Sequence, residues 1–201
     1  MYKRQIVDDS IDESNETVVL TLSSPSNATL GSDNIHTYTI NDNEDTPIID
    51  FNTTNSSGTE SVSSKTITVD LSGPSSEIVT VDYAVSGSAT GSGIDYSLIS
   101  GTLSIAAGNT TGTITIANIV DDTTDETDET VIVTLSSPSN ATLGVDKVHT
   151  YTITDDDDQP VISFDVTNST GSESISSTAI TVNLSAASSS DITVNLSLIH
   201  I

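Results

Sequence analysis

The residues of this chain with the clearest chemical potential are its carboxylates, which recur in dense runs. Of 201 residues, 29 are Asp or Glu and only 4 are Lys or Arg, which gives a formal net charge of −25. The densest runs are IVDDTTDETDET at 119–130, called the acidic loop below, and DDDD at 155–158. Hard divalent cations prefer oxygen ligands, and Ca²⁺ accepts about six to eight of them in flexible geometry. These runs are therefore the first candidates for a cation site.

The composition argues against several other kinds of site. Binding to nucleic acid needs clustered Lys and Arg that displace phosphate counterions, and this chain has few of either. It has no Cys for a disulfide, a thiol nucleophile or a zinc-thiolate site. No apolar run approaches the ~20 residues of a membrane span, so we expect no direct membrane insertion. The Ser-rich stretches 56–64 and 169–177 have no accompanying base and are predicted to be polar connections.

Catalysis is also not expected. Paired carboxylates serve glycoside hydrolysis when they flank a substrate cleft and have divergent pKa values. With 5 Tyr, 2 Phe and no Trp, the chain has few aromatic side chains to line such a cleft. His36 and His149 alternate in step with neighbouring apolar residues, so that they point to the same face of their predicted strands as those residues. We therefore predict that they pack in strands rather than bind metal. We therefore expect no enzyme activity.

An internal repeat divides the chain. IVDDSIDESNETVVLTLSSPSNATLG at 6–31 returns at 119–144 as IVDDTTDETDETVIVTLSSPSNATLG, an offset of 113 residues. PIIDF at 47–51 returns at the same offset as PVISF at 160–164. The repeat predicts a C-terminal part of a first module at 6–46, a complete central module at 47–158 and an N-terminal part of a third module at 159–195.

The two ends of the chain do not fit the repeat. MYKRQ at 1–5 and LSLIHI at 196–201 resemble translations, from opposite strands, of an adapter used in transposase-based sequencing libraries. Such segments are set aside before fold reasoning. The remaining sequence is then expected to be a fragment of a larger protein.

The elements that must position the acidic runs are short strands. Low hydrophobicity with high charge is typical of disorder, but the abundance of Ile, Val and Thr favours strands instead. In the central module, apolar and polar residues alternate between polar turns. The pattern predicts an all-β fold of tandem immunoglobulin-like antiparallel β-sandwiches with about seven strands each. The predicted strands are 47–51, 66–71, 78–85, 101–106, 112–119, 130–136 and 148–154.

Strand direction predicts where the acidic residues gather. If consecutive strands alternate in direction, the connections after the first, third and fifth strands and the end of the seventh lie at one end, called the acidic end below. The other end would hold only Glu77 and Asp146. Crowded carboxylates repel by ~1 kcal/mol per pair at ~4 Å in water, so we expect Ca²⁺ between them. The acidic end would hold Glu60, Asp95, Asp121, Asp122, Asp125, Glu126, Asp128, Glu129 and Asp155 to Asp158.

Several sequence features together resemble one known family. VDYAVSGSATGSGIDYSLISG at 81–101, the acidic loop and the closing YTITDDDD are similar to the Calx-beta domain of sodium/calcium exchangers and large bacterial surface proteins. The resemblance covers the central module and both partial modules. In calcium-sensing members of the family it implies that Ca²⁺ is bound by the residues that match here Glu60, Asp95, Asp121, Asp122, Glu126, Glu129, Asp155, Asp156 and Asp157.

The chain departs from the calcium sensors at some positions. Thr123 stands where sensors have a third consecutive Asp. The first module closes with NDNED, with Asn41 and Asn43 in place of two Asp, which predicts a weaker site. Glu173 represents the site of the third module. The ligands that persist in the first module are predicted to be Asp8, Asp9, Glu13, Glu16 and Asp42.

The resemblance implies a role as well as a fold. We expect calcium-binding structural or adhesive modules of a bacterial surface or secreted protein, located outside the cell, in which Ca²⁺ stiffens the joints between modules. The expected partners are calcium ions, neighbouring modules and a cell-surface or matrix ligand reached through other domains. Two alternatives are a passive acidic spacer and a calcium-sensor domain of a membrane transporter.

Overall fold

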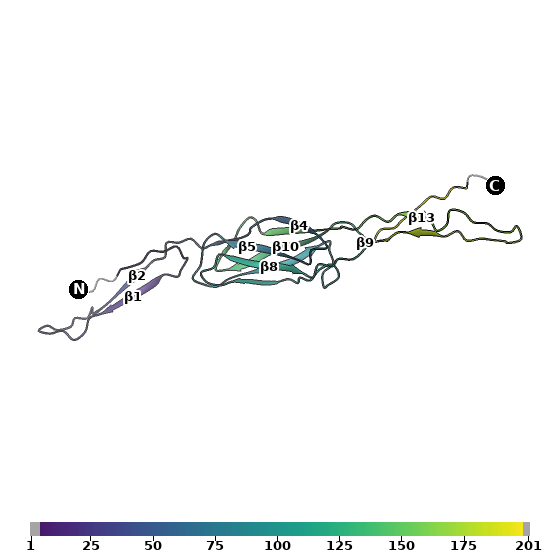
Figure 1. Cartoon of the computed structure of the whole chain (residues 1–201). Helices are drawn as coiled ribbons and strands as arrows, with labels where there is room; N and C mark the ends of the chain where they lie inside the picture. Colours follow the sequence, from purple (N-terminus) through teal and green to yellow (C-terminus); the bar gives the residue numbers. More distant parts are fainter. Residues whose placement is uncertain (1–4, 199–201) are drawn as a thin grey trace.

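The structure is a computed structural model that describes residues 5–198. A central β-sandwich lies between two small hairpins, one on each side, in an elongated molecule (Figure 1). The described residues contain no helix that could cross a membrane. The end segments 1–5 and 196–201 fall largely outside the described part.

The central module forms two packed sheets from residues 48–154. The five-stranded sheet has the order β4 (Asn55–Thr59), β12 (Val148–Thr154), β10 (Glu129–Ser139), β6 (Val79–Gly87) and β7 (Gly101–Ile105). The four-stranded sheet has the order β11 (Thr142–Leu143), β3 (Ile48–Phe51), β5 (Ser64–Leu71) and β8 (Thr111–Ala117). The seven predicted strands are all present, with bounds shifted by up to three residues, and the predicted all-β sandwich is confirmed.

One segment predicted to be a connection is a strand in the structure. Asn55–Thr59, in the Ser-rich stretch expected to be a polar connection, is β4 and pairs in parallel with β12. Its sequence NSSGT lacks the apolar alternation from which strands are predicted. It forms a strand because the chain leaves β3 and crosses to the edge of the other sheet. Gly58 allows close approach there, since a Cβ at this position would lie 2.5 Å from the Tyr151 hydroxyl.

The core lies between the two sheets and consists of alternate residues of their strands. Most of these apolar residues are buried, and Tyr83, Val85 and Leu103 are partly buried against the core. Tyr96 and Ile119, outside the strands, complete the core at the acidic end. Fully buried side chains, at 0–2% exposure, include Ile49, Phe51, Ile67, Val69, Val79, Val81, Ile105, Ile116, Val131, Val133, Leu135 and Tyr151.

His149 packs inside the sandwich rather than at a metal site. It is 1% exposed and its ring lies 5.6 Å from that of Phe51, measured between centroids. Its Nε2 is 2.8 Å from Ser56 Oγ and its Nδ1 is 2.6 Å from the Thr53 carbonyl oxygen. These bonds tie β12 to β4 and to the turn before it.

The flanking partial modules reproduce pieces of the central one. The β1 (Glu16–Thr21) and β2 (Ile35–Ile40) hairpin pairs Glu16 with Ile40, as β10 and β12 pair Glu129 with Ile153. On the other side, β13 (Ile162–Phe164) pairs with β14 (Val182–Leu184). Two short strands, β9 (Thr124–Asp125) and β15 (Ala187–Ser188), pair across the joint between the central and third modules.

Candidate calcium site

The parallel pairing of β4 and β12 brings two distant acidic segments together. Both strands end at the acidic end, and the Glu60 backbone N–H donates to the Thr154 carbonyl oxygen at 3.2 Å. Glu60 follows β4 directly and Asp155 follows β12 directly. The pairing therefore fixes Glu60 beside the first residue of the DDDD run.

Asp95 reaches the same place from the loop between β6 and β7. The Val120 N–H donates to the Asp95 carbonyl oxygen at 2.9 Å, just before Asp121 in the acidic loop. Ser97 forms a bridge with Ala117 at the end of β8. The loop is closed from within by a bond from the Thr90 N–H to an Asp95 carboxylate oxygen. These bonds place Asp95 next to the start of the acidic loop.

The acidic loop is ordered by its own carboxylates. Asp122 Oδ1 accepts the Thr124 N–H at 2.7 Å, which is an Asx turn. Asp128 Oδ1 accepts the Asp155 N–H at 3.3 Å and links the loop to the DDDD run. The loop therefore projects its side chains toward the segments that carry Glu60, Asp95 and Asp155.

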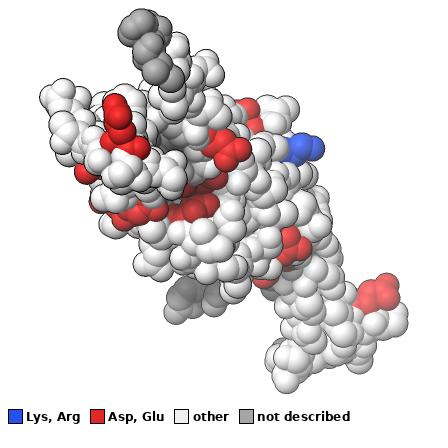
Figure 2. Space-filling view, turned by 90° about the vertical axis from the view of Figure 1, so that its right-hand side faces the viewer, with Lys and Arg blue, Asp and Glu red and all other residues white. Residues whose placement is uncertain are grey.

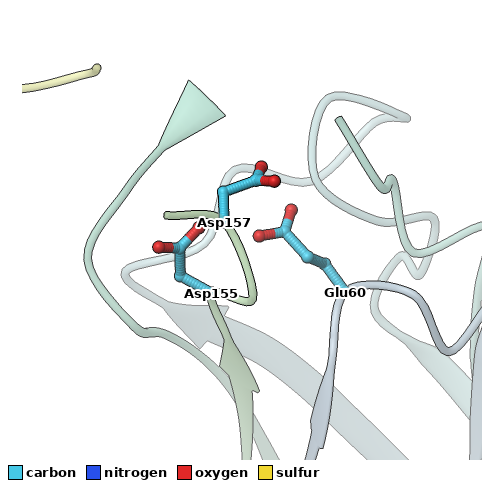
Figure 3. A group of neighbouring side chains, drawn as sticks. All are labelled: Glu60, Asp155 and Asp157. Carbon is cyan, nitrogen blue, oxygen red and sulfur yellow. The ribbon is translucent and has the colours of Figure 1, made fainter. Parts of the chain in front are cut away.

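Three carboxylates converge at this end. Glu60, Asp155 and Asp157 each offer an oxygen, and these oxygens lie within 4.8 Å of one another. Figure 3 shows the three side chains close together, with Glu60 coming from one segment and Asp155 and Asp157 from another. Seen from the side of the third module, acidic side chains gather on this face (Figure 2). A cavity of about 30 Å³ lies here, lined by Glu60, Asp95, Asp122, Glu126, Glu129 and Asp155 together with Ile94, Val120, Thr127 and Ile153.

Two buried oxygens in this group have no hydrogen-bond partner. Asp155 Oδ1 and Asp157 Oδ2 are both inaccessible to solvent and unpaired. A buried unpaired carboxylate oxygen is costly, because it has lost water without gaining a donor. The described residues around the site bring several carboxylates and no Lys or Arg within salt-bridging reach. An oxygen-only, negatively charged donor set of this kind fits a hard divalent cation and does not fit metals that require imidazole or thiolate.

The electrostatics of the site are those of crowded like charges. Burial and the contact with Asp155, reinforced by repulsion from Asp122 and Asp156, raise the pKa of Glu60 to about 7. Burial and the contact with Asp95 likewise raise the pKa of Glu129 to about 7. Protonation relieves the repulsion in each pair, and a bound cation would relieve it in the same way.

The remaining predicted ligands of the central module lie at the same end. Asp156 accepts a hydrogen bond from Ser61 Oγ at 3.0 Å. Burial raises the pKa of Asp157, with repulsion from Asp155, Asp122, Asp156 and Asp121. All nine residues proposed from the resemblance are thus gathered at the acidic end, and six of them line the 30 Å³ cavity, whereas Asp121, Asp156 and Asp157 do not.

The first module repeats part of this arrangement. A second cavity, of about 90 Å³, is lined by the predicted Asp8, Asp9, Glu13, Glu16 and Asp42. The Glu13 N–H donates to Asp42 Oδ2 at 3.1 Å. The bond from the Ile11 N–H to Asp9 Oδ1, 2.9 Å, repeats the Asx turn at Asp122.

Sequence reasoning missed one acidic residue of this second site. Glu44 also lines the 90 Å³ cavity, and burial, with the neighbouring Asp42, raises its pKa. The 113-residue offset could have found it, because Glu44 corresponds to Asp157. The same offset corrects the prediction for Asn41, which corresponds to Thr154, so that Asn43 is the one asparagine of the two that replaces an aspartate. In the third module, Glu173 is exposed.

Comparison with known proteins identifies the architecture. The family model of the Calx-beta domain matches residues 3–44, 42–157 and 155–199. The crystal structure of the apo-form Calx CBD1 domain has a TM-score of 0.50 and 26% identity, and the match covers 56% of this chain and 100% of that one.

Two further solved structures contain a pair of such domains. CBD12 from CALX1.2 has a TM-score of 0.51 and 25% identity, and calcium binding domain CBD12 of CALX1.1 has a TM-score of 0.50 and 27% identity. Each match covers 59% of this chain and 48% of the solved one, so the chain spans about half the length of those two proteins. No curated protein matched. With three matches that together cover nearly the whole sequence, the chain belongs to the Calx-beta domain family as a tandem array.

Proposed function

We propose that the central module binds Ca²⁺ at its acidic end and that the array is a binding and spacing element rather than an enzyme. The observation that carries the proposal is the convergence of Glu60, Asp155 and Asp157, with unpaired buried oxygens on both aspartates. Ca²⁺ would supply the missing partners and offset the mutual repulsion. Support also comes from the name of a solved relative, calcium binding domain CBD12 of CALX1.1.

The proposed ligands of the central module fall into two groups. Glu60, Asp155, Asp156 and Asp157 come from the ends of β4 and β12. Asp95, Asp121, Asp122, Glu126 and Glu129 come from the loop before β7 and the acidic loop. In the first module we propose a second, weaker site at Asp8, Asp9, Glu13, Glu16 and Asp42, to which Glu44 adds a carboxylate.

The position of the site beside a joint suggests what binding achieves. The DDDD run continues directly into Gln159 and Pro160, and β13 of the third module begins at Ile162. A cation bound to the acidic loop and to the DDDD run would hold the linker that follows this run against the central module. We propose that Ca²⁺ stiffens the joints of a rod-like extracellular or cell-surface protein. Extracellular modules of this kind work with dissociation constants on the order of 10⁻⁴ to 10⁻³ M.

Isothermal titration of the whole chain with CaCl₂ tests the site. We expect saturable heat that falls sharply in the Glu60→Gln and Asp155→Asn variants. Glu77→Gln, which changes an exposed acidic residue at the opposite end, should leave the heat unchanged. Absence of saturable heat in the unmodified chain would reject the calcium site and leave a passive acidic spacer.

Small-angle scattering with calcium and with chelator tests the stiffening. We expect a larger and better defined maximum dimension in calcium. Unchanged dimensions would reject the mechanical role even where titration detects binding. A transporter's cytosolic sensor, the third alternative, would require micromolar affinity in the same titration.

A further inference from the structure

The two joints of the chain contain the same contact between modules. At the second joint, β9 in the acidic loop pairs in parallel with β15, which aligns Asp125 with Ser188. At the first joint, Asp12 in the first module's copy of the acidic loop forms a parallel bridge with Ser75 of the central module. Asp125 and Ser188 lie 113 residues after Asp12 and Ser75, which is the length of the repeat, so one interface occurs twice.

Backbone bonds define the first joint. The Asp12 N–H donates to the Pro74 carbonyl oxygen at 3.1 Å, and the Ser76 N–H donates to the Asp12 carbonyl oxygen at 2.9 Å. Ser75 is 2% exposed and its Oγ lies 3.3 Å from Asp12 Oδ2. The receiving segment, residues 74–76, is called the serine turn.

The second joint repeats this geometry with different neighbours. The Ser189 N–H donates to the Asp125 carbonyl oxygen at 3.0 Å, and Ser188 Oγ donates to Asp125 Oδ2 at 3.0 Å. The serine turn of the third module is 187–189, where Ala187 replaces Pro74. The contact therefore does not depend on proline in the turn.

We propose that Asp12 and Asp125 are docking residues that recognise the serine turn of the next module. The aspartate offers its backbone carbonyl and one carboxylate oxygen, and the turn offers a backbone N–H and a serine hydroxyl. The partner that fits this surface is another module of the same kind with Ser at the position of Ser75 and Ser188. Neither aspartate is among the proposed calcium ligands, so docking sets the orientation of successive modules without a cation.

Hydrogen bonds within the central module hold the serine turn in place. The Ser75 Oγ also accepts the Glu77 N–H at 3.3 Å, and the Ser75 carbonyl oxygen accepts the Gly108 N–H at 2.8 Å. These bonds hold the turn against the body of the central module. On one side of the joint the serine turn is therefore held by hydrogen bonds within its own module. On the other side lies the loop that also carries proposed calcium ligands.

The absence of cysteine from the chain makes the joint accessible to spin labelling. Cysteines introduced at the exposed positions Ser104 and Ser177 would report the distance between the central and third modules by pulsed electron resonance. In EDTA we expect a distance distribution with one dominant peak for the otherwise unmodified chain, and its residual width is the motion that Ca²⁺ is proposed to reduce. Asp125→Ala and Ser188→Ala should each broaden it at least twofold, and Asp125→Asn, which keeps an acceptor oxygen, should preserve it.

Controls separate docking from calcium binding and from misfolding. Asp33→Ala removes an equal charge from an exposed site far from the joint and should change nothing. Ser188→Ala leaves every proposed calcium ligand in place, and the melting of the central module should be unaltered. Because all measurements are made in EDTA, failure of the calcium proposal would not change these outcomes. A distribution without a dominant peak in the unmodified chain, or an unchanged distribution in both Ala variants, would overturn docking.

Discussion

Glu60 and Asp155 bring carboxylate oxygens within 4.8 Å of each other, although they belong to the opposite ends of the central module's sequence. Parallel pairing of β4 with β12 produces this contact, since each residue directly follows one of the two strands. Two carboxylates in such proximity repel each other, and one of them, Glu60, is 7% exposed. The pair therefore destabilises the fold, and a bound cation would offset the repulsion.

Neutralising Glu60 should have opposite effects with and without calcium. In chelator, Glu60→Gln removes a buried like charge, and we expect stabilisation on the order of 1 kcal/mol, a melting temperature about 4–8 °C higher. In millimolar Ca²⁺ the variant loses a charged ligand, and its melting temperature should fall below that of the unmodified chain. Thermal unfolding measured by circular dichroism, with Glu77→Gln as control, checks this reversal. A shift of the same sign in both conditions would contradict it.

Stability in chelator should decline as pH rises from about 4.5 to about 7. The folded pKa of Glu60 is about 7, above the ordinary value of 4.5, so between these values the folded state binds more protons than the unfolded chain. Glu129 acts in the same direction. We expect the melting temperature to decrease across this interval in EDTA and to decrease less in saturating Ca²⁺. A melting temperature that stays constant or rises with pH in EDTA would show that these carboxyl groups do not have the raised pKa values given above.

Replacing His149 should weaken both the fold and the calcium site. His149→Leu removes the hydrogen bonds to the Thr53 carbonyl oxygen and the Ser56 hydroxyl, at a cost of about 0.5–1.5 kcal/mol for each bond. Since β4 carries Glu60 at its end, loosening β4 should also lower calcium affinity. His36→Leu is the matched control, because His36 occupies the same repeat position but is exposed. Chemical denaturation and calorimetric titration measure the two effects, and equal behaviour of the two variants would refute the assignment.

Gly87 at the end of β6 should tolerate no side chain. Its φ is +133°, and a Cβ would lie 2.0 Å from the Thr130 carbonyl oxygen. We expect Gly87→Ala to reduce the free energy of unfolding by more than ~1 kcal/mol, because both the backbone and the neighbouring strand must shift. Gly73→Ala has open space around the new methyl group and should change stability little. Urea denaturation compares the two, and similar midpoints would contradict the strain argument.

Much of this architecture could be predicted without coordinates. Alternation of apolar residues located the seven main strands, and strand direction located the acidic end. The same reasoning failed at β4, because NSSGT has no apolar alternation and becomes a strand only through the open edge of β12. It also overlooked Glu44, which needed the repeat offset applied to the end of the first module. The joints were likewise not predicted, since a contact between Asp125 and Ser188 has no signature in either segment alone.

The amino-acid sequence by itself determined the strands and the residues that face one side of each strand, because these depend on local periodicity. Burial was decided by tertiary structure. Val18 and Val131 occupy the same repeat position and pair in the same register, yet Val18 is 44% exposed and Val131 is 0% exposed. An alternating strand specifies which face is apolar, but that face leaves water only when a second sheet, built from distant segments, packs against it. The same holds for the acidic end, where residues dispersed along the chain become a site only after the sandwich has closed.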